Sequence, residues 1–332
     1  MKPVYVPNYY PAFKCIASAC RHTCCVGWEI DVDEEALACY DAVKGPMGAR
    51  LRQNIDREAD PPCFVLDGEE RCPFLNRNGL CDLITELGED ALCHICADHP
   101  RFRNVLYDRV ELGLGLCCEA AAALILSQTE PLRIIRLPDT EASYERTAHG
   151  EPDEPDSITD ALLTAREALL TVAQDRTLPL SERFRHILTS LDIQLPMNDY
   201  AEWAEFLADL ERLDPAWDSR LEALSTLPED PAGELDGETS IAYEQIFCYF
   251  VYRYMTAEDD GRPALLQVRT AFAILSTVLI HALVRATGRT DADTLAEIAW
   301  LYSSEIEYSE ENLERFWDEL QDAGYELQDT ET

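Results

Sequence analysis

The second half of the chain carries a regular pattern of apolar and polar residues that predicts helices. Apolar residues recur there every three to four positions, which is the spacing of one face of an α-helix. Ser181, Asp291 and Ser309 are the expected caps at helix starts, and Gly288 is the expected stop at one helix end. We therefore predict an all-helical domain over residues 157–332. Its helices are expected at residues 158–174, 181–191, 199–213, 242–257, 264–288, 291–309 and 311–320.

The first part of the chain has shorter segments, separated by turn residues such as Asn78-Gly79. Residues 104–116, with sequence NVLYDRVELGLGL, predict a short β-hairpin, and an alanine-rich helix is expected at residues 119–127. We predict a separate N-terminal module over residues 1–128 and a mainly α protein as a whole.

Two further segments have specific expectations. Residues 129–156 are predicted to be a linker or surface loop, because their second half is polar and carries two prolines. The glycines at the end of the predicted hairpin superficially match a nucleotide-binding loop. The hairpin is favoured, because the chain after residue 118 has almost no strand-like segments.

The most apolar segment, Thr270 to Val284, is predicted to be a buried core helix and not a membrane span. It is fifteen residues long and lies between Arg269 and Arg285. At a rise of ~1.5 Å per residue, such a segment is too short to cross ~30 Å of hydrocarbon.

Cysteine is the strongest compositional signal, because twelve of the thirteen cysteines lie in the first 118 residues. The N-terminus has no apolar run long enough for a signal peptide, so a reducing, cytoplasmic location is expected. Clustered thiols in that compartment indicate metal ligands more than disulfides. Eight of them stand in a spaced pattern: Cys15, Cys20, Cys24, Cys25, Cys72, Cys81, Cys96 and Cys117.

The spacing leaves the metal open between zinc and an iron-sulfur cluster. Structural zinc usually uses pairs of cysteines with two residues between them, and only Cys93 and Cys96 have that spacing. Iron-sulfur clusters accept more scattered thiolates. Neighbours such as Cys24 and Cys25 point in different directions, so they could serve two centres, or one centre and a reactive thiol.

These segments resemble the flagellin lysine-N-methylase family, whose members share an eight-cysteine zinc- or iron-chelating module. The eight spaced cysteines match that module, and the other five look like additions: Cys39, Cys63, Cys93, Cys118 and Cys248. The resemblance lies in residues 9–35, 71–101, 114–126, 247–255 and 301–316. The chain departs from the family pattern where an Arg, a His and an aromatic residue are expected, at Ser304, Tyr308 and His99.

The resemblance implies methyl transfer from S-adenosylmethionine to lysines of flagellin, with a 4Fe-4S cluster taking part and zinc as the alternative metal. Nucleic acid is not an expected partner, because a formal net charge of −37 repels phosphate backbones. The same charge could attract a lysine-bearing protein.

Methyl transfer to lysine needs a group that makes the amine neutral. Tyr302 and Glu305 are the predicted catalytic residues, because both lie on one face of the helix expected at residues 291–309. Tyr249, Phe250, Tyr252 and Tyr254 could form an aromatic wall for a cationic group. Arg253 is expected to be a buried partner of a glutamate.

The sequence therefore predicts a cytoplasmic lysine N-methyltransferase that acts on flagellin. The alternative is a non-catalytic iron or zinc carrier or adaptor.

Overall fold

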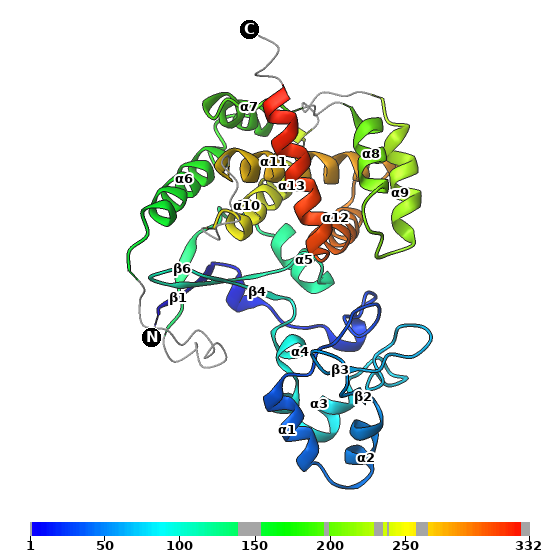
Figure 1. The fold of residues 1–332 in the computed structure, drawn as a ribbon. Coiled ribbons are helices and arrows are strands. Elements are labelled where there is room, and N and C mark those ends of the chain that lie inside the picture. The colour runs from blue at the N-terminus through cyan, green and yellow to red at the C-terminus, as the bar shows by residue number, and fades with distance from the viewer. Residues whose placement is uncertain are drawn as a thin grey trace. The chain divides into compact units, whose positions relative to one another are not determined.

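The computed structural model of the chain describes residues 2–138, 154–195, 199–228, 235–237, 239–256 and 265–326. Contacts divide the chain into two compact units (Figure 1). The smaller unit, called the cysteine-rich unit below, contains residues 14–102 and 118–120. The larger unit contains residues 1–13, 103–117 and 121–332.

The described residues are mainly helical, as predicted. Helices of the larger unit are α5 (Glu119–Leu126), α6 (Ser157–Ala173), α7 (Leu180–Ser190), α8 (Tyr200–Ala208), α9 (Ala216–Ser225), α10 (Ser240–Tyr254), α11 (Leu265–Ala286), α12 (Ala292–Ile306) and α13 (Glu310–Glu326). A short 3-10 helix, η1 (Tyr10–Ala12), precedes them.

One small sheet accompanies these helices, with strand order β4-β5-β1-β6. Its strands are β1 (Val4–Pro7), β4 (Arg101–Val105), β5 (Val110–Leu114) and β6 (Ile134–Arg136). The predicted hairpin is confirmed as β4 and β5, which are neighbours joined by a tight turn. The sequence interpretation missed β1 and β6. These strands pair with other parts of the chain, β1 parallel to β5 and antiparallel to β6.

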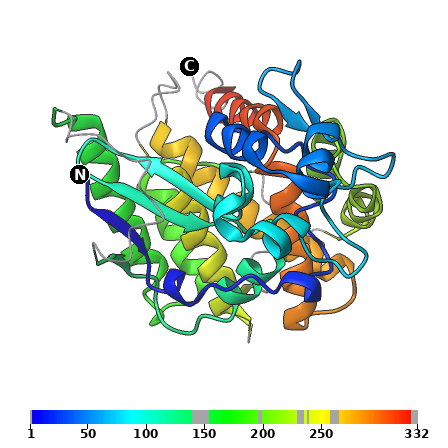
Figure 2. The ribbon, with the colours of Figure 1, turned by 90° about the horizontal axis from the view of Figure 1, so that it is seen from below.

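Helices α6 and α10 lie on one face of the sheet (Figures 1 and 2). Arg166 of α6 forms a buried, bidentate ion pair with Glu111 of β5, with both N···O distances at 2.6 Å. Tyr252 of α10 donates a hydrogen bond to the Leu112 carbonyl at 3.0 Å. Side chains of a strand point alternately to its two faces, and in β5 this places the Glu111 carboxylate against the helices. The Arg166 guanidinium compensates the buried charge of Glu111.

The core of the larger unit surrounds α11, which packs against α9, α10, α12 and α13. Every residue from Val268 to Val284 is buried, so the prediction of a core helix is confirmed. The length argument was wrong, because the helix has 22 residues and is long and apolar enough to cross a membrane. However, 94% of its most apolar window is buried inside the structure, where it contacts other helices.

The predicted helices correspond to observed ones, with one addition. Helix α9 was missed, because no element was predicted between the helices at residues 199–213 and 242–257; α8 itself ends earlier, at Ala208. Asp291 caps α12 by accepting a hydrogen bond from the Thr294 amide at 3.0 Å.

The other predicted helix signals gave mixed results. Ser309 accepts a hydrogen bond from the Asn312 amide at the start of α13, and Gly288 has the positive φ expected after a helix. The prediction of a helix cap at Ser181 was wrong. Ser181 lies inside α7, and its hydroxyl donates a hydrogen bond to the Asp236 carboxylate at 2.6 Å.

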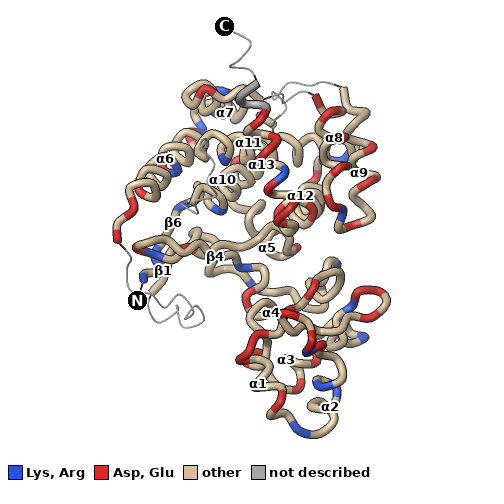
Figure 3. The backbone as a smooth tube through the Cα atoms, in the orientation of Figure 1, with Lys and Arg blue, Asp and Glu red and all other residues tan. Residues whose placement is uncertain are grey.

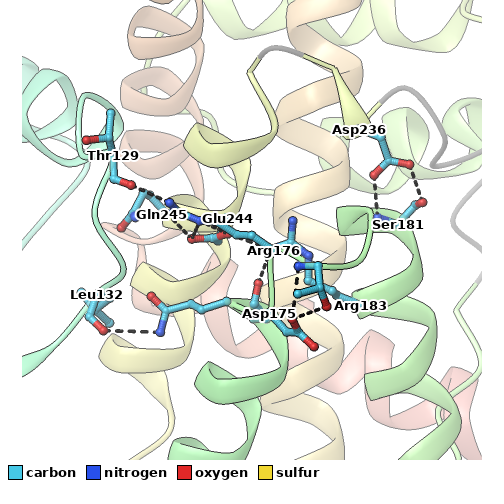
Figure 4. Close-up of polar contacts among 12 residues, drawn as sticks. Thr129, Leu132, Asp175, Arg176, Ser181, Arg183, Asp236, Glu244 and Gln245 are labelled. Atoms are coloured by element: carbon cyan, nitrogen blue, oxygen red, sulfur yellow. Dashed lines mark hydrogen bonds and ion pairs between the residues drawn. The ribbon is translucent and has the colours of Figure 1, made fainter.

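A second buried carboxylate joins the turn between α6 and α7 to α10 (Figure 4). Glu244 of α10 is fully buried and pairs with Arg176 at 2.8 Å and with Arg183 at 2.7 Å. Arg176 also donates to the Thr129 carbonyl at 2.6 Å. Two guanidinium groups around one carboxylate compensate its desolvation, so this cluster has a structural role.

The cysteine-rich unit consists of short elements around its own core. These are the 3-10 helices η2 (Ala17–Ala19) and η3 (Glu89–Ala91), the helices α1 (Glu34–Ala42), α2 (Gly45–Gln53), α3 (Asp82–Leu87) and α4 (His94–Asp98), and the paired strands β2 (Ile55–Asp56) and β3 (Cys63–Phe64). Its core contains packed aromatic rings, in which Phe64 stacks on Tyr40 and lies tilted against Phe74.

The predicted ranges 1–128, 129–156 and 157–332 divide the chain along its sequence, whereas each compact unit combines separate stretches. Residues 139–153 of the predicted linker lie outside the described residues. The part of the linker before them contains β6.

Candidate functional site

The cysteine-rich unit contains all the cysteines except Cys117 and Cys248. All thirteen lie in the described residues and carry free thiols. Contacts and electrostatic effects divide nine of them into two groups. The first thiol group is Cys15, Cys20, Cys24 and Cys118. The second thiol group is Cys25, Cys72, Cys81, Cys93 and Cys96.

Glu119 fixes the first thiol group at the start of α5. Its carboxylate accepts hydrogen bonds from the Arg21 amide at 2.8 Å and from the Arg21 side chain at 2.9 Å. The Cys20 thiol donates to the same carboxylate at 3.6 Å. Burial raises the pKa of Cys20 to about 11, and the negative charges of Glu119 and Cys118 raise it too. Cys118 is therefore close to the segment that carries Cys20.

Cys24 connects the first thiol group to the second. The hydrogen bond between the Cys24 and Cys25 thiols lowers the pKa of Cys25 to about 7 and raises that of Cys24. After this bond and burial, the charges of Cys15 and Cys118 raise the pKa of Cys24 further. The vicinal pair thus contributes one thiol to each group, as the sequence interpretation allowed.

The second thiol group gathers residues from three separate segments. A hydrogen bond from Cys96 lowers the pKa of Cys93, and the charges of Cys25 and Cys72 act on Cys96. Burial raises the pKa of Cys72 to about 12, and Cys25 and Cys81 add to this effect. Cys93 was predicted to be an addition to the spaced pattern, but its side chain is fully buried beside Cys96.

Of the two cysteines that precede α5, the sequence interpretation chose Cys117. Cys117 belongs to the larger unit, where its side chain is buried and hydrogen-bonded with Tyr308. Cys118 belongs to the cysteine-rich unit and acts on Cys20 and Cys24. The contacts therefore favour Cys118 as the member of the first thiol group. The short spacing of the two residues could not separate them.

The donor chemistry of both groups suits a soft metal or an iron-sulfur cluster. Among the described residues, however, no three His, Cys, Asp or Glu side chains are arranged to hold one ion. Metal binding would require these thiols to turn toward one another and lose their protons, since ligand sites commonly form together with the metal.

The predicted catalytic pair on α12 is not brought together. The Tyr302 hydroxyl is fully buried and donates to the Ser276 hydroxyl at 2.9 Å. The Glu305 carboxylate accepts hydrogen bonds from the amides of Leu213 and Asp214, the former at 3.0 Å. Burial raises the pKa of Glu305 to about 7, although both amides lower it. Each residue thus has its own structural partners, and catalysis by the pair stays a prediction.

The four predicted aromatic residues of α10 face different surroundings. Phe250 packs edge-on against Phe272 of α11, and the Tyr252 hydroxyl bonds to backbone carbonyls of the sheet. Only Tyr249 and Tyr254 share a polar partner. Both hydroxyls donate to one oxygen of Glu307 at 2.8 Å.

The expected partner of Arg253 is Glu307, with Nη1 and Oε2 3.2 Å apart. The guanidinium lies over the rings of Tyr254 and Tyr308, at 5.2 and 5.4 Å from their centroids. Glu307 was not among the site residues predicted from the sequence. Glu307 directly follows α12, a helix that also carries Asp293, Glu297 and Glu305, so its position gives no distinct sequence signal.

Acidic residues spread over both units, and in the larger unit they line α8, α9 and α13 (Figure 3). Some are compensated, as in the exposed pairs Arg212 with Asp218 and Arg315 with Asp209. With 64 acidic and 27 basic residues, most carboxylates have no basic residue to balance them.

Fold and thiol groups define a mainly helical protein with a cysteine-rich unit. No family model matches the chain, and no solved structure matches it. Two curated proteins named lysine-N-methylase, from Salmonella typhimurium strain LT2 and Salmonella choleraesuis strain SC-B67, are each 28% identical to it over 142 residues. That match covers 40% of this chain and 35% of each relative, so it spans about a third of their length.

A third relative is the flagellar biosynthetic protein FliU of Salmonella muenchen. It is 28% identical over 142 residues, which cover 40% of this chain and 84% of that protein. These similarities support the resemblance to flagellin lysine-N-methylases over part of the chain.

Proposed function

We propose that this protein is a lysine N-methyltransferase that acts on flagellin in the cytoplasm, with S-adenosylmethionine as the methyl donor. The observation that carries the proposal is the similarity to two proteins named lysine-N-methylase and to the flagellar protein FliU. Because the match covers part of each lysine-N-methylase, the activity, substrate and partner of the whole protein belong to the proposal.

The acidic surface supports a basic protein partner over nucleic acid. A net charge of −37 attracts a lysine-rich patch and repels phosphates. It does not make a lysine reactive, since neighbouring negative charge raises the pKa of an amine. The reaction therefore requires a local group that takes the lysine proton before the methyl group is transferred.

We also propose that the cysteine-rich unit holds a 4Fe-4S cluster, with zinc as the alternative. The two thiol groups supply the ligand type that either metal requires. The predicted ligands are the eight spaced cysteines, and the contacts of Cys118 make it an alternative to Cys117. When bound, a cluster with an open iron could hold the amino and carboxylate groups of the methyl donor.

The test of the proposed activity uses the full chain, purified without oxygen, together with unmodified flagellin and S-adenosylmethionine. We expect intact-mass spectra of flagellin to gain mass in steps of one methyl group, on lysines. Higher salt should slow the reaction, because it screens attraction between the acidic enzyme and a basic patch. Flagellin that stays unmodified after prolonged incubation with metal-loaded protein would contradict the proposal.

A second candidate function is metal carriage without catalysis. It is favoured by the exposure of Cys15 and Cys24, since a carrier must present thiols to a recipient protein. The two candidates separate in the same experiment. A carrier would transfer its metal to an acceptor chelator or protein and leave flagellin unmodified.

A further inference from the structure

Glu307 is a buried carboxylate at the end of α12 with an uneven set of partners. Its side chain has no exposed surface. One oxygen, Oε2, accepts hydrogen bonds from Tyr249 and Tyr254 and lies 3.2 Å from the Arg253 guanidinium. The other oxygen, Oε1, has no hydrogen-bond partner among the described residues.

An unpartnered carboxylate oxygen in the interior is costly. Leaving a buried charged acceptor unsatisfied costs more than the ~1–3 kcal/mol typical of a neutral group. Buried acceptors are nearly always satisfied, so an exception indicates an ion, a water molecule or a ligand that completes it. The neighbouring groups decide which of these fits.

Those groups suit an amine. The hydroxyls of Tyr249 and Tyr254 contact the carboxylate, the Tyr308 ring lies against Arg253, and aromatic faces attract cationic groups. Arg253, Tyr254 and Tyr308 are only partly buried, whereas Glu307 lies behind them. A slender side chain that ends in a nitrogen donor would reach Oε1 by displacing these partly exposed side chains, and an anion would be repelled by the carboxylate.

We propose that Oε1 of Glu307 accepts a hydrogen bond from the amine of the lysine that is to be methylated. This inference rests on the proposed function and adds to it the residue that receives the substrate amine. It is independent of Tyr302 and Glu305, whose polar atoms already bond within the protein.

The Arg253 charge also affects the protonation state of an amine bound at Oε1 of Glu307. A lysine that arrives as an ammonium would be a second cation beside the guanidinium, in a buried site. Both effects favour the neutral amine, as for other reactive lysines that lie next to a cation. Arg253 also feels the charges of Tyr249, Tyr254, Glu307 and Tyr308. Two further titratable groups face this site: Tyr302 interacts with Glu307, and Cys117 is hydrogen-bonded with Tyr308.

The transfer can then be written with all atoms accounted for. The ammonium gives one proton to Oε1 of Glu307, which becomes a neutral carboxylic acid. The free nitrogen lone pair attacks the methyl carbon of the sulfonium donor. A new C–N bond forms as the S–CH₃ bond breaks, and the sulfur keeps the bonding electrons. The product is a methylammonium group and a neutral thioether.

The test measures amine binding apart from methylation, with n-butylamine as the probe and tetramethylammonium as a cation that has no N–H donor. Probe binding to the full chain is followed by NMR titration. We expect n-butylamine to bind and tetramethylammonium to bind at least about tenfold more weakly, because the contact is a charge-assisted hydrogen bond. Glu307→Gln should weaken n-butylamine binding by about tenfold or more.

Two control variants keep the result specific. Glu311→Gln removes an exposed carboxylate near the start of α13 and should leave amine binding unchanged. Glu244→Gln removes another buried, arginine-paired carboxylate; it should lower stability and leave amine binding unchanged. Should Glu307→Gln fail to fold, Glu307→Asp keeps the charge but withdraws the oxygen by one methylene group, and should also weaken binding.

Each outcome is decisive. Equal binding of n-butylamine by wild type and both Glu307 variants, equal binding of both probes, or no binding by the wild type would overturn the inference. Amine binding that depends on Glu307, with flagellin left unmethylated, would support the amine site and contradict the proposed function. Methylation at a normal rate in Glu307→Gln would contradict the site and leave the function standing.

Discussion

Arg166 and Glu111 face each other in the interior of the larger unit, with two parallel hydrogen bonds of 2.6 Å that join α6 to β5. The ring of Tyr252 lies 5.4 Å from the Arg166 guanidinium and covers it. Such a buried pair contributes little compared with apolar packing, but removal of one partner leaves an uncompensated charge.

Breaking this pair should therefore destabilise the larger unit strongly. We expect Arg166→Met to lower the free energy of unfolding by about 3–5 kcal/mol. Arg289→Met, which removes an exposed ion pair with Asp291, should cost about 0–1 kcal/mol. Urea unfolding followed by circular dichroism measures both. Similar losses in the two variants would show that the buried pair is already compensated in another way.

The metal proposal predicts a coloured protein. Purified without oxygen, the chain should absorb broadly near ~400 nm and contain iron and acid-labile sulfide in similar amounts. Cys24→Ala and Cys72→Ala should lose metal, whereas Cys248→Ala should retain it, because Cys248 is buried in the larger unit. Colourless protein with stoichiometric zinc would support the alternative metal.

The choice between two adjacent cysteines has its own test. The electrostatic effect of Cys118 on Cys20 and Cys24 predicts that Cys118→Ala lowers metal content, while Cys117→Ala leaves it near the wild-type level. The opposite result would restore the assignment made from sequence spacing. Metal analysis of both variants, with circular dichroism to check folding, distinguishes the two.

Substitutions of Tyr302 and Glu305 distinguish a catalytic role of these residues from a structural one. If Tyr302 and Glu305 take the lysine proton, Tyr302→Phe and Glu305→Gln should slow methyl transfer by ~100-fold or more in folded protein. Their hydrogen bonds predict instead a stability loss of about 1 kcal/mol each and an unchanged rate per folded molecule. We expect the second result. Rates normalised to the folded fraction decide between them.

Glu305 also predicts a pH dependence of stability. Its pKa is about 7 in the folded protein and 4.5 in a free side chain. Between these values the folded state holds a proton that the unfolded state has lost, so the contribution of Glu305 falls as pH rises from 4.5 to 7. The contribution of His99 to stability rises with pH instead, because burial lowers its pKa from 6.5 to about 4 and the unfolded state then holds the extra proton.

The difference between wild type and Glu305→Gln isolates the glutamate. The unfolding free energy of wild type should fall relative to that of the variant by at most ~1.4 kcal/mol per pH unit in this window. Urea unfolding at a series of pH values measures the difference. A constant difference would show that Glu305 keeps its charge throughout.

The sequence predicted long helices well and contacts between distant segments poorly. Helices such as α11 and α12 have a period and caps that are local, so residues like Asp291 mark them directly. Strand β1 was missed because four residues carry little pattern, and its partners lie more than a hundred positions away. The sequence alone could not supply that pairing.

The candidate site shows the same limit. Cysteine spacing indicated a metal site, but the separation of Cys24 from Cys25 depends on interactions with residues of four different segments. Glu307 could not be recognised, because its partners Tyr249, Arg253 and Tyr254 lie on another helix, α10, far away in the sequence. Arg253 was predicted correctly, since a charge within an apolar helix requires a buried partner.

The parallel pairing of Val4 with Val110 sets an order of events during synthesis of the chain. The ribosome makes β1 first, then almost all of the cysteine-rich unit, and β5 only afterwards. At ~5–20 residues per second, β1 waits roughly 5 to 20 seconds for its partner. Cys118 to Ala120 emerge last, directly after β5. The first thiol group therefore receives its final member only after β5, the parallel partner of β1, has been made.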